Sequence, residues 1–147
     1  MIIRQAENSD LADVLALYTH LHGNQMPSLN NSLIKLWMQI INDPNHYVLL
    51  GIEDKLIISS CVLLIVPNLT HNQRPYALIE NVVTHKDYRR RGCATSVLNF
   101  AKEIATQNNC YKIMLVTGSK EESTLRFYGQ AGYNSHDKTA FVQWLNA

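Results

Sequence analysis

Hydrophobic residues recur at two different spacings along the chain, and each change of spacing marks a new predicted element. A spacing of about 3.6 residues, which places apolar side chains on one face of a helix, occurs in four segments. The first predicted helix follows Ser9 or Asp10, either of which can cap it, and the others span residues 32–41, 92–106 and 121–130. Asp43-Pro44 ends the second helix, and Ala131-Gly132 ends the fourth.

Runs rich in β-branched residues predict strands between these helices. The predicted strands are residues 2–3, 47–52, 56–66, 76–84, 111–117 and 139–145. The turn Glu53-Asp54-Lys55 joins the second and third strands as an antiparallel hairpin. Strand 76–84, helix 92–106 and strand 111–117 form a crossover, which normally pairs its two strands in parallel. We therefore predict an α/β (α+β) fold with a mixed central sheet and helices on its faces.

Composition limits the size and the partners of this protein. Its 147 residues, 46% hydrophobic and 17% charged, suit one soluble domain spanning residues 1–147. Thirteen Lys plus Arg against twelve Asp plus Glu leave a formal net charge of +1, which argues against nucleic acid and anionic membranes as partners. The longest apolar run, residues 56–66, is too short to span a bilayer, and the first residues turn polar too early for a signal peptide.

The cysteines and histidines indicate neither a disulfide framework nor a metal site. Cys61, Cys93 and Cys110 are odd in number and have no C-x-x-C spacing, which is typical of a protein in the reducing cytoplasm. His20 and His22 are two residues apart, so on a helix they point to different faces rather than toward one metal ion. We therefore expect a cytoplasmic protein without a bound metal.

A basic, glycine-containing turn precedes the third predicted helix and carries the candidate chemistry. It reads Arg89-Arg90-Arg91-Gly92-Cys93-Ala94-Thr95. The first N–H groups of a helix lack internal partners and carry the positive end of its dipole, and Gly92 lets an anion approach the backbone closely. The three guanidinium groups can each bind phosphate oxygens through two hydrogen bonds. The pattern indicates a phosphate site, and the alternative is a solvated basic turn.

The motifs around this turn limit which phosphate-bearing ligand it can bind. Neither GxxxxGK[ST] nor GxGxxG occurs, which argues against ATP and NAD. Arg89-x-x-Gly92-x-Ala94 matches the acetyl-CoA motif Gln/Arg-x-x-Gly-x-Gly/Ala, and here the chain resembles the GCN5-related N-acetyltransferase (GNAT) superfamily. The resemblance extends to Ile79-Glu80-Asn81-Val82-Val83, to Phe127-Tyr128 and to Ala131-Gly132-Tyr133. It implies a mixed, mostly antiparallel sheet with a splayed parallel strand pair, flanked by about four helices.

The resemblance also implies acetyl-CoA as the cosubstrate. In the family, the backbone at Val82 and Val83 holds the pantetheine arm, and the amides from Arg91 to Thr95 hold the pyrophosphate. The cofactor-binding residues that the resemblance implies are Val82, Val83, Arg89, Arg90, Arg91, Gly92, Cys93, Ala94 and Thr95. An Asn that often precedes the family tyrosine by seven residues is Glu121 here, and the run Thr117-Gly118-Ser119-Lys120 can supply donors in its place.

Tyr128 is the general acid that the resemblance implies. A phenol, with a reference pKa near 10, can protonate a leaving thiolate whose conjugate acid has a pKa of roughly 8.5 to 10. Without the resemblance, Phe127-Tyr128 would be interpreted as an aromatic pair of the core.

Glu80 is the first candidate general base. Its apolar strand neighbours predict burial on both faces, and a partly desolvated carboxylate can take a proton from a substrate ammonium, as some family members do from this position. An ion pair or an N–H bond would account for a buried Glu80 equally well. His85 is a second candidate base. Cys93 is an alternative nucleophile beside the arginines, but a packing role suits it better, and direct attack in a ternary complex is the family norm.

The acceptor is left open by the sequence. Residues 23–31 and 67–75, the loops that set acceptor specificity in the family, contain no acidic cluster and no evident carboxylate clamp. We therefore expect a primary amine of a small molecule or of a peptide or protein. The tail after Gly132 has one predicted strand where many relatives have two, so a partner chain can supply the other in a homodimer. The alternative to an N-acetyltransferase is a non-catalytic acyl-CoA-binding module.

Overall fold

The structure is a computed structural model that describes residues 1–21, 23 and 25–146. The chain forms two compact units, Met1–Leu115 and Val116–Ala147, and each is described by itself. Whether residues 1–147 act as the single domain that the composition predicts stays a prediction.

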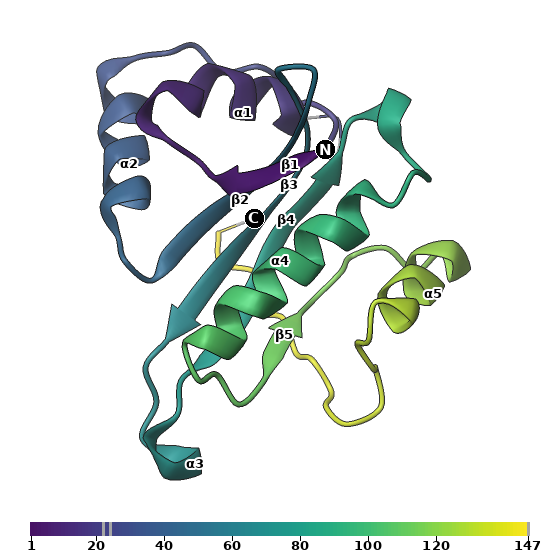
Figure 1. The fold of residues 1–147 in the computed structure, drawn as a ribbon. Helices are drawn as coiled ribbons and strands as arrows, with labels where there is room; N and C mark the ends of the chain where they lie inside the picture. The colour runs from purple at the N-terminus through teal and green to yellow at the C-terminus, as the bar shows by residue number, and fades with distance from the viewer. Residues whose placement is uncertain (22, 24, 147) are drawn as a thin grey trace. The chain divides into compact units, whose positions relative to one another are not determined.

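A five-stranded sheet forms the centre of the first unit (Figure 1). The strands lie side by side in chain order and are β1 (Ile2–Gln5), β2 (His46–Glu53), β3 (Leu56–Val66), β4 (Tyr76–Thr84) and β5 (Ile113–Leu115). Every neighbouring pair is antiparallel except β4 and β5, which are parallel. The predicted mixed sheet is confirmed, and so is the hairpin, whose turn holds Asp54 and Lys55 at positive φ.

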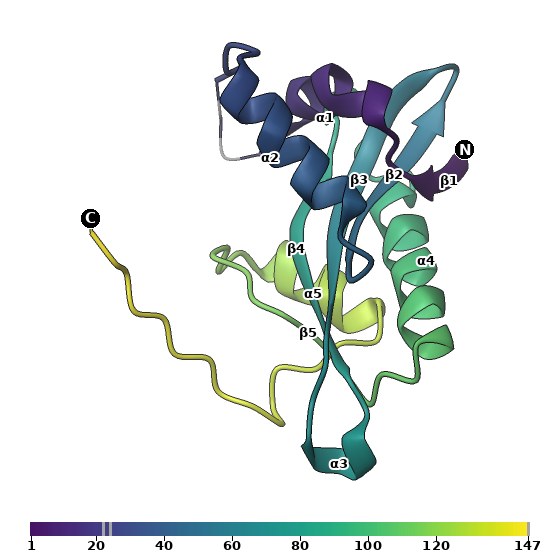
Figure 2. The ribbon, with the colours of Figure 1, turned by 90° about the vertical axis from the view of Figure 1, so that its left-hand side faces the viewer.

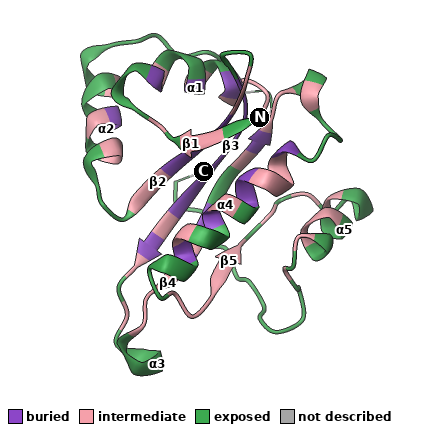
Figure 3. Ribbon diagram, viewed as in Figure 1, coloured by how far each residue is buried: buried purple, intermediate pink, exposed green. Residues whose placement is uncertain are grey.

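Helices cover both faces of this sheet (Figure 2). On one face lie α1 (Leu11–Tyr18) and α2 (Asn31–Asn42), and on the other lies α4 (Cys93–Gln107), while α3 (Thr70–Gln73) is a single kinked turn between β3 and β4. The buried positions accordingly lie on the central strands and on one side of α4 (Figure 3). A Cβ on Gly51 of β2 would lie 3.2 Å from Val97 of α4, so the missing side chain lets this helix approach the sheet closely.

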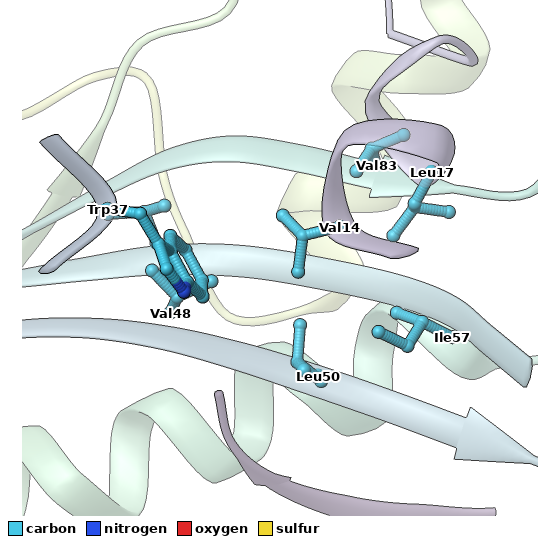
Figure 4. Packing of buried hydrophobic residues seen from close by; sticks show 8 residues of the cluster. Val14, Leu17, Trp37, Val48, Leu50, Ile57 and Val83 are labelled. Carbon is cyan, nitrogen blue, oxygen red and sulfur yellow. The ribbon is translucent and has the colours of Figure 1, made fainter. Parts of the chain in front are cut away.

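The core between the sheet and the first two helices is built around Trp37 (Figure 4). Its other buried members are Val14, Leu17, Val48, Leu50, Ile57, Val62 and Val83. The indole Nε1 of Trp37 donates to the backbone oxygen of Asn8 at 3.1 Å, so the one polar atom of this large side chain is satisfied. The apolar stripe of α2, which includes Trp37, predicted that one face of this helix is buried.

A carboxylate fixes the entry into α1. The side chain of Asp10 accepts hydrogen bonds from Arg4 Nη1 at 2.7 Å, Arg4 Nη2 at 3.0 Å and the amide of Glu7 at 2.7 Å. The Arg4 hydrogen bond lowers the pKa of the Asp10 carboxyl below its usual range. Because Arg4 lies on β1, this ion pair links the first strand to the start of α1.

The second unit contains α5 (Glu122–Gln130), which ends at Ala131-Gly132 as predicted, with Gly132 at a φ of +99°. The strand predicted at residues 139–145 is wrong: residues 138–146 form neither helix nor strand (Figure 2). A strand needs a hydrogen-bonded neighbour, and a run of strand-favouring residues does not supply one. For the same reason β5, predicted over residues 111–117, is paired only over Ile113–Leu115.

Candidate active site

The edge of β4 is open along its second half. β4 pairs with β5 only at Ala77, Leu78 and Ile79, whereas its pairing with β3 continues to Thr84. From Glu80 onward, β4 therefore has no strand partner on the β5 side among the described residues. An open edge offers backbone N–H and C=O groups to an extended ligand that carries amides of its own.

A β-bulge interrupts β4 at the start of this open edge. Ser60 pairs with Val83 and Val62 with Glu80, so Asn81 and Val82 together lie opposite Cys61. Asn81 has a φ of +52°, which is the left-handed region.

Glu80 and Asn81 are both exposed, and the bulge accounts for Asn81, which strict alternation with the buried Ala77 and Ile79 would have buried. The predicted burial of Glu80 on both faces is therefore wrong. The physical reason is that Glu80 points to the side opposite the buried Ala77 and Ile79, and β5, which pairs with β4 only up to Ile79, does not extend beside it. Val82 is half-buried and Val83 is buried beside the open edge.

Tyr18, at the end of α1, is a polar residue near the bulge that sequence reasoning missed. Burial raises the pKa of its phenol above the usual value, an effect that the side chains of Ser60 and Asn81 partly offset. The phenol is therefore protonated at neutral pH. The pattern that predicted this helix assigned no role to Tyr18, because the bulge forms only when β4 pairs with β3.

The predicted phosphate turn leads from the end of β4 into α4. A short 3₁₀ turn, Lys86–Tyr88, is followed by Arg90 at a φ of +62° and by Gly92 at +77°, the residue that caps α4. The amide of Ser96 donates to the Gly92 oxygen at 3.0 Å, so the helix ladder starts there. The amides before Ser96 have no carbonyl to reach within the helix, as helix geometry requires. This end of α4 is therefore a cluster of backbone donors at the positive end of the helix dipole.

The three arginines of the turn occupy different positions. Arg89 donates from Nε to the Thr84 oxygen at 3.1 Å and from Nη2 to the His20 oxygen at 3.2 Å. Arg91 lies 3.3 Å from Glu53 Oε1, and its guanidinium carbon lies 5.0 Å from the ring centre of Tyr88. Arg90 is exposed and forms no ion pair with any residue that the structure describes.

The remaining residues of the turn separate into buried and accessible positions. Cys93 is only 6% exposed, as a packing residue would be, whereas Ala94 and Thr95 are partly exposed on the first turn of α4. His85, the second candidate base, accepts the amide of Asp87 at its Nδ1 at 3.2 Å, and its ring centre lies 4.2 Å from that of His20. His22 lies outside the described residues.

Tyr128 belongs to the second unit and lies in α5. Its ring meets that of Phe127 at 5.0 Å and an interplanar angle of 61°, and that of Tyr133 at 6.3 Å and 85°. These edge-to-face contacts are the aromatic pairing that the sequence also predicted. The acid role of Tyr128 stays a prediction.

Two features, a cluster of metal ligands and a membrane-spanning helix, are absent from the described residues. No group of three or more His, Cys, Asp or Glu side chains within residues 1–21, 23 and 25–146 is arranged to hold a metal ion. No helix in the described part of the chain is long and apolar enough to cross a membrane. Cys61, Cys93 and Cys110 are all free thiols.

The sequence and the fold are similar to those of known acetyltransferases. Residues 11–133 match the Acetyltransferase (GNAT) family. The chain is 28% identical over 144 residues to the glucosamine 6-phosphate N-acetyltransferase of Trypanosoma brucei brucei, covering 92% of this chain and 90% of that protein. A putative acetyltransferase from Agrobacterium tumefaciens str. C58 has a solved structure with a TM-score of 0.91 and 32% identity, covering 98% of this chain and all of that one.

More distant structures share the fold. The glucosamine-6-phosphate N-acetyltransferase of Arabidopsis thaliana has a TM-score of 0.84 at 19% identity, covering 99% of this chain and 98% of that chain. This likeness extends over nearly the whole length of both chains. The sheet order, the open half of β4 and the helix that follows it therefore belong to a known architecture.

Proposed function

Because the chain belongs to the GNAT family of acetyltransferases, we propose that it transfers the acetyl group of acetyl-CoA to the primary amine of a small molecule. One observation carries the proposal: within one compact unit, the open edge of β4 leads through a glycine-capped turn into the free N-terminus of α4. The first feature suits an extended chain with amides, and the second suits an anion. Acetyl-CoA, the cosubstrate of this family, has both an extended amide-containing arm and an anionic pyrophosphate.

The residues present fit this cosubstrate. The backbone at Val82 and Val83, beside the bulge, is proposed to hold the pantetheine arm as an added strand would be held. The amides from Arg91 to Thr95 are proposed to hold the pyrophosphate, with Arg90 supplying charge from the surface. Arg91 can join them by leaving Glu53, because this ion pair is partly exposed and therefore weak.

The proposed reaction is direct transfer in a ternary complex. The neutral amine nitrogen attacks the thioester carbonyl carbon, a C–N bond forms, and the C–S bond breaks to release the thiolate of CoA. Glu80 takes the proton from the substrate ammonium and releases it to water. Tyr128 donates a proton to the departing thiolate, and the second proton that the nitrogen loses after the attack restores the phenol of Tyr128. The exposure of Glu80 supports the first role, since a base that serves a bound substrate must be accessible to it. His85 or a water molecule is the second candidate for this base.

The names of the relatives support a small acceptor. The Trypanosoma brucei brucei relative is named for glucosamine 6-phosphate, and Streptothricin acetyltransferase A of Bacillus subtilis is 39% identical over 59 residues, which is 40% of this chain and 34% of that protein. Both names denote amine-bearing small molecules. We therefore propose a small amine rather than a peptide or protein as the acceptor.

Acetyl-CoA is expected to raise the melting temperature of the protein, whereas ATP and NAD at the same concentration are not. A ligand at 100 times its Kd stabilises the folded state by about 2.7 kcal/mol, which corresponds to roughly 5–10 °C for a chain of this size. The measurement is a thermal melt with each ligand, followed by a free-CoA assay against a panel of amines. Absence of a shift with acetyl-CoA would refute the proposal. A shift without CoA release from any amine would favour the non-catalytic binding module.

We also propose that the protein is a homodimer in which the C-terminal segment of each chain is covered by the other. Phe141, Val142, Trp144 and Leu145 are between 60% and 93% exposed, and they fall within residues 139–145, the segment that the sequence predicted as a strand. Burying a large apolar side chain is worth about 1.5–3 kcal/mol, so covering four of them is a substantial driving force.

The dimer is tested by substituting Trp144 with Ser. Light scattering after size exclusion should give the wild type twice the mass of one chain, and the Trp144→Ser variant should dissociate at concentrations at least about tenfold higher. Leu69→Ser is the matched control, because Leu69 is 86% exposed but stands alone in the loop before α3. A wild type that is still monomeric at roughly 100 µM would contradict the proposal.

A further inference from the structure

Arg89, the first residue of the motif, faces two backbone carbonyls. Its Nε donates to the oxygen of Thr84, the last residue of β4, and its Nη2 donates to the oxygen of His20, just after α1. One planar guanidinium group therefore joins the end of the open strand to the end of the first helix. The two donors that make these contacts are no longer available to a phosphate.

His20 makes a second tie to the same turn. Its Nδ1 accepts the amide of Lys86 at 3.4 Å, and its ring packs on His85 with the centres 4.2 Å apart and the planes inclined by 38°. Both rings line a pocket of about 140 Å³ between α1 and the start of β3. The turn of residues 85–92 is thus attached to the end of α1 through a side chain, a backbone carbonyl and a ring contact.

We propose that Arg89 and His20 are positioning residues that clasp the turn of residues 85–92 against the end of α1, and that Arg89 does not contact the phosphates of the ligand. The proposal rests on the proposed function, because the clasped turn is the one that would hold the pyrophosphate. The amides at the start of α4 act on a ligand only when their direction is set in advance. The clasp sets that direction, because it fixes both the end of β4 and the 3₁₀ turn that precede Gly92.

Acidification is expected to open the clasp at His20. The pKa of His20 is lowered, first by burial and then by the neighbouring His85, Arg89 and Lys86, while Asp87 raises it. Asp13 faces the same pocket. Only a neutral imidazole can accept the Lys86 amide at Nδ1. Because the pKa of His20 is lower in the folded protein than its usual 6.5, the stability that the neutral ring contributes is complete above pH 6.5 and is lost as the pH falls through the folded-state pKa. The tie should therefore weaken below about pH 6.5.

The first experiment separates the effect of the positive charge from the effect of the planar guanidinium shape, at Arg89 and at Arg90. Arg89→Lys, Arg89→Gln, Arg90→Lys and Arg90→Gln are titrated with acetyl-CoA by calorimetry at low and high salt. A lysine keeps the charge of an arginine but has no planar fork to span two carbonyls. We expect both Arg89 variants to bind acetyl-CoA about tenfold more weakly, with the salt dependence of the wild type.

The Arg90 variants are the matched control, because this exposed side chain has no ion pair among the described residues. Arg90→Lys should keep most of the affinity, and Arg90→Gln should lose affinity together with part of the salt dependence. If Arg89→Lys binds like the wild type while Arg89→Gln does not, Arg89 acts by its charge and the clasp is refuted.

The second experiment needs no ligand and measures hydrogen exchange of the Lys86 amide. His20→Phe keeps a ring but removes the acceptor, whereas His20→Asn offers an amide oxygen near the position of Nδ1 and does not titrate. We expect exchange at Lys86 to rise about tenfold in His20→Phe and in Arg89→Gln, after correction with the amides of the β2–β3 ladder, which report global opening. His20→Asn should retain protection and lose the acceleration that we expect for the wild type below about pH 6.5.

The two experiments separate the clasp from the proposed function. Unchanged Lys86 exchange in both His20→Phe and Arg89→Gln would overturn the clasp whatever the protein binds. Failure of the wild type to bind acetyl-CoA would overturn the proposed function, while the exchange data would still decide whether the clasp exists. If Arg89→Gln does not fold, Arg89→Lys and His20→Phe provide the same comparison.

Discussion

Replacing Tyr128 with Phe is expected to lower kcat for acetyl transfer by about 10²- to 10³-fold, within the range of general acid catalysis, and to leave the Kd of acetyl-CoA within about twofold. The substitution removes one hydroxyl and keeps the ring that contacts Phe127 and Tyr133 edge to face. The thiolate must then leave without a proton, which raises the barrier of the step in which the C–S bond breaks. Steady-state kinetics and calorimetry on the same preparation measure the two quantities.

Tyr133→Phe is the control for this prediction. Tyr133 has the same side chain and lies 6.3 Å from Tyr128, ring centre to ring centre, but it has no proposed role in proton transfer. Its removal should change kcat by less than about threefold, in line with a small packing change. If Tyr128→Phe retains wild-type kcat while acetyl-CoA still binds, Tyr128 is not the acid, and the buried phenol of Tyr18 becomes the next residue to test.

Replacing Glu80 with Gln is expected to lower kcat/KM for the amine by about 10²-fold at neutral pH, with little change in acetyl-CoA affinity. Glutamine has almost the same shape but cannot take the proton of the substrate ammonium. The deficit should shrink as pH approaches the pKa of the amine, because the free amine then reaches the site without help. A pH profile of kcat/KM for the wild type and for Glu80→Gln measures this recovery.

Glu103→Gln provides the matched control, since Glu103 is an exposed carboxylate on α4 with no proposed role. It removes the same charge from the chain and should leave the profile unchanged. A Glu80→Gln enzyme with the full rate at neutral pH would exclude Glu80 as the base. His85→Asn would then distinguish the imidazole from a water molecule.

The elements around the site could be predicted because each is encoded by local patterns. The apolar stripe beginning at Ala94 and the glycine before it predicted α4 and its first residue to within one position. The β-branched run of residues 76–84 predicted β4 with its observed bounds. Both patterns depend on which face of one element is buried, and that information lies within the element itself.

The bulge in β4 could not be predicted in this way. An extra residue is visible only when the strand is laid against its partner, here Cys61 opposite Asn81 and Val82. Its effect is to expose Asn81, which strict alternation with Ala77 and Ile79 would have buried. The exposure of Glu80, next to the bulge, likewise depends on a distant part of the chain, because β5 pairs with β4 only up to Ile79.

The same limit applies to long-range polar contacts and to the C-terminal strand. Three consecutive arginines look equivalent in a sequence, but only the folded chain brings the oxygen of His20 to Arg89 and the carboxylate of Glu53 to Arg91. Residues 139–145 are rich in strand-favouring residues, yet a strand exists only where a neighbour supplies its hydrogen bonds.

Local chemistry along the chain thus established the elements, the glycine-capped helix start and the motif that identifies the family, because each depends on neighbours a few residues away. The exposure of Glu80, the separate tasks of the three arginines and the clasp at His20 depend on residues far apart in the chain. Those were decided by packing, since only the assembled sheet and its helices set which distant groups meet.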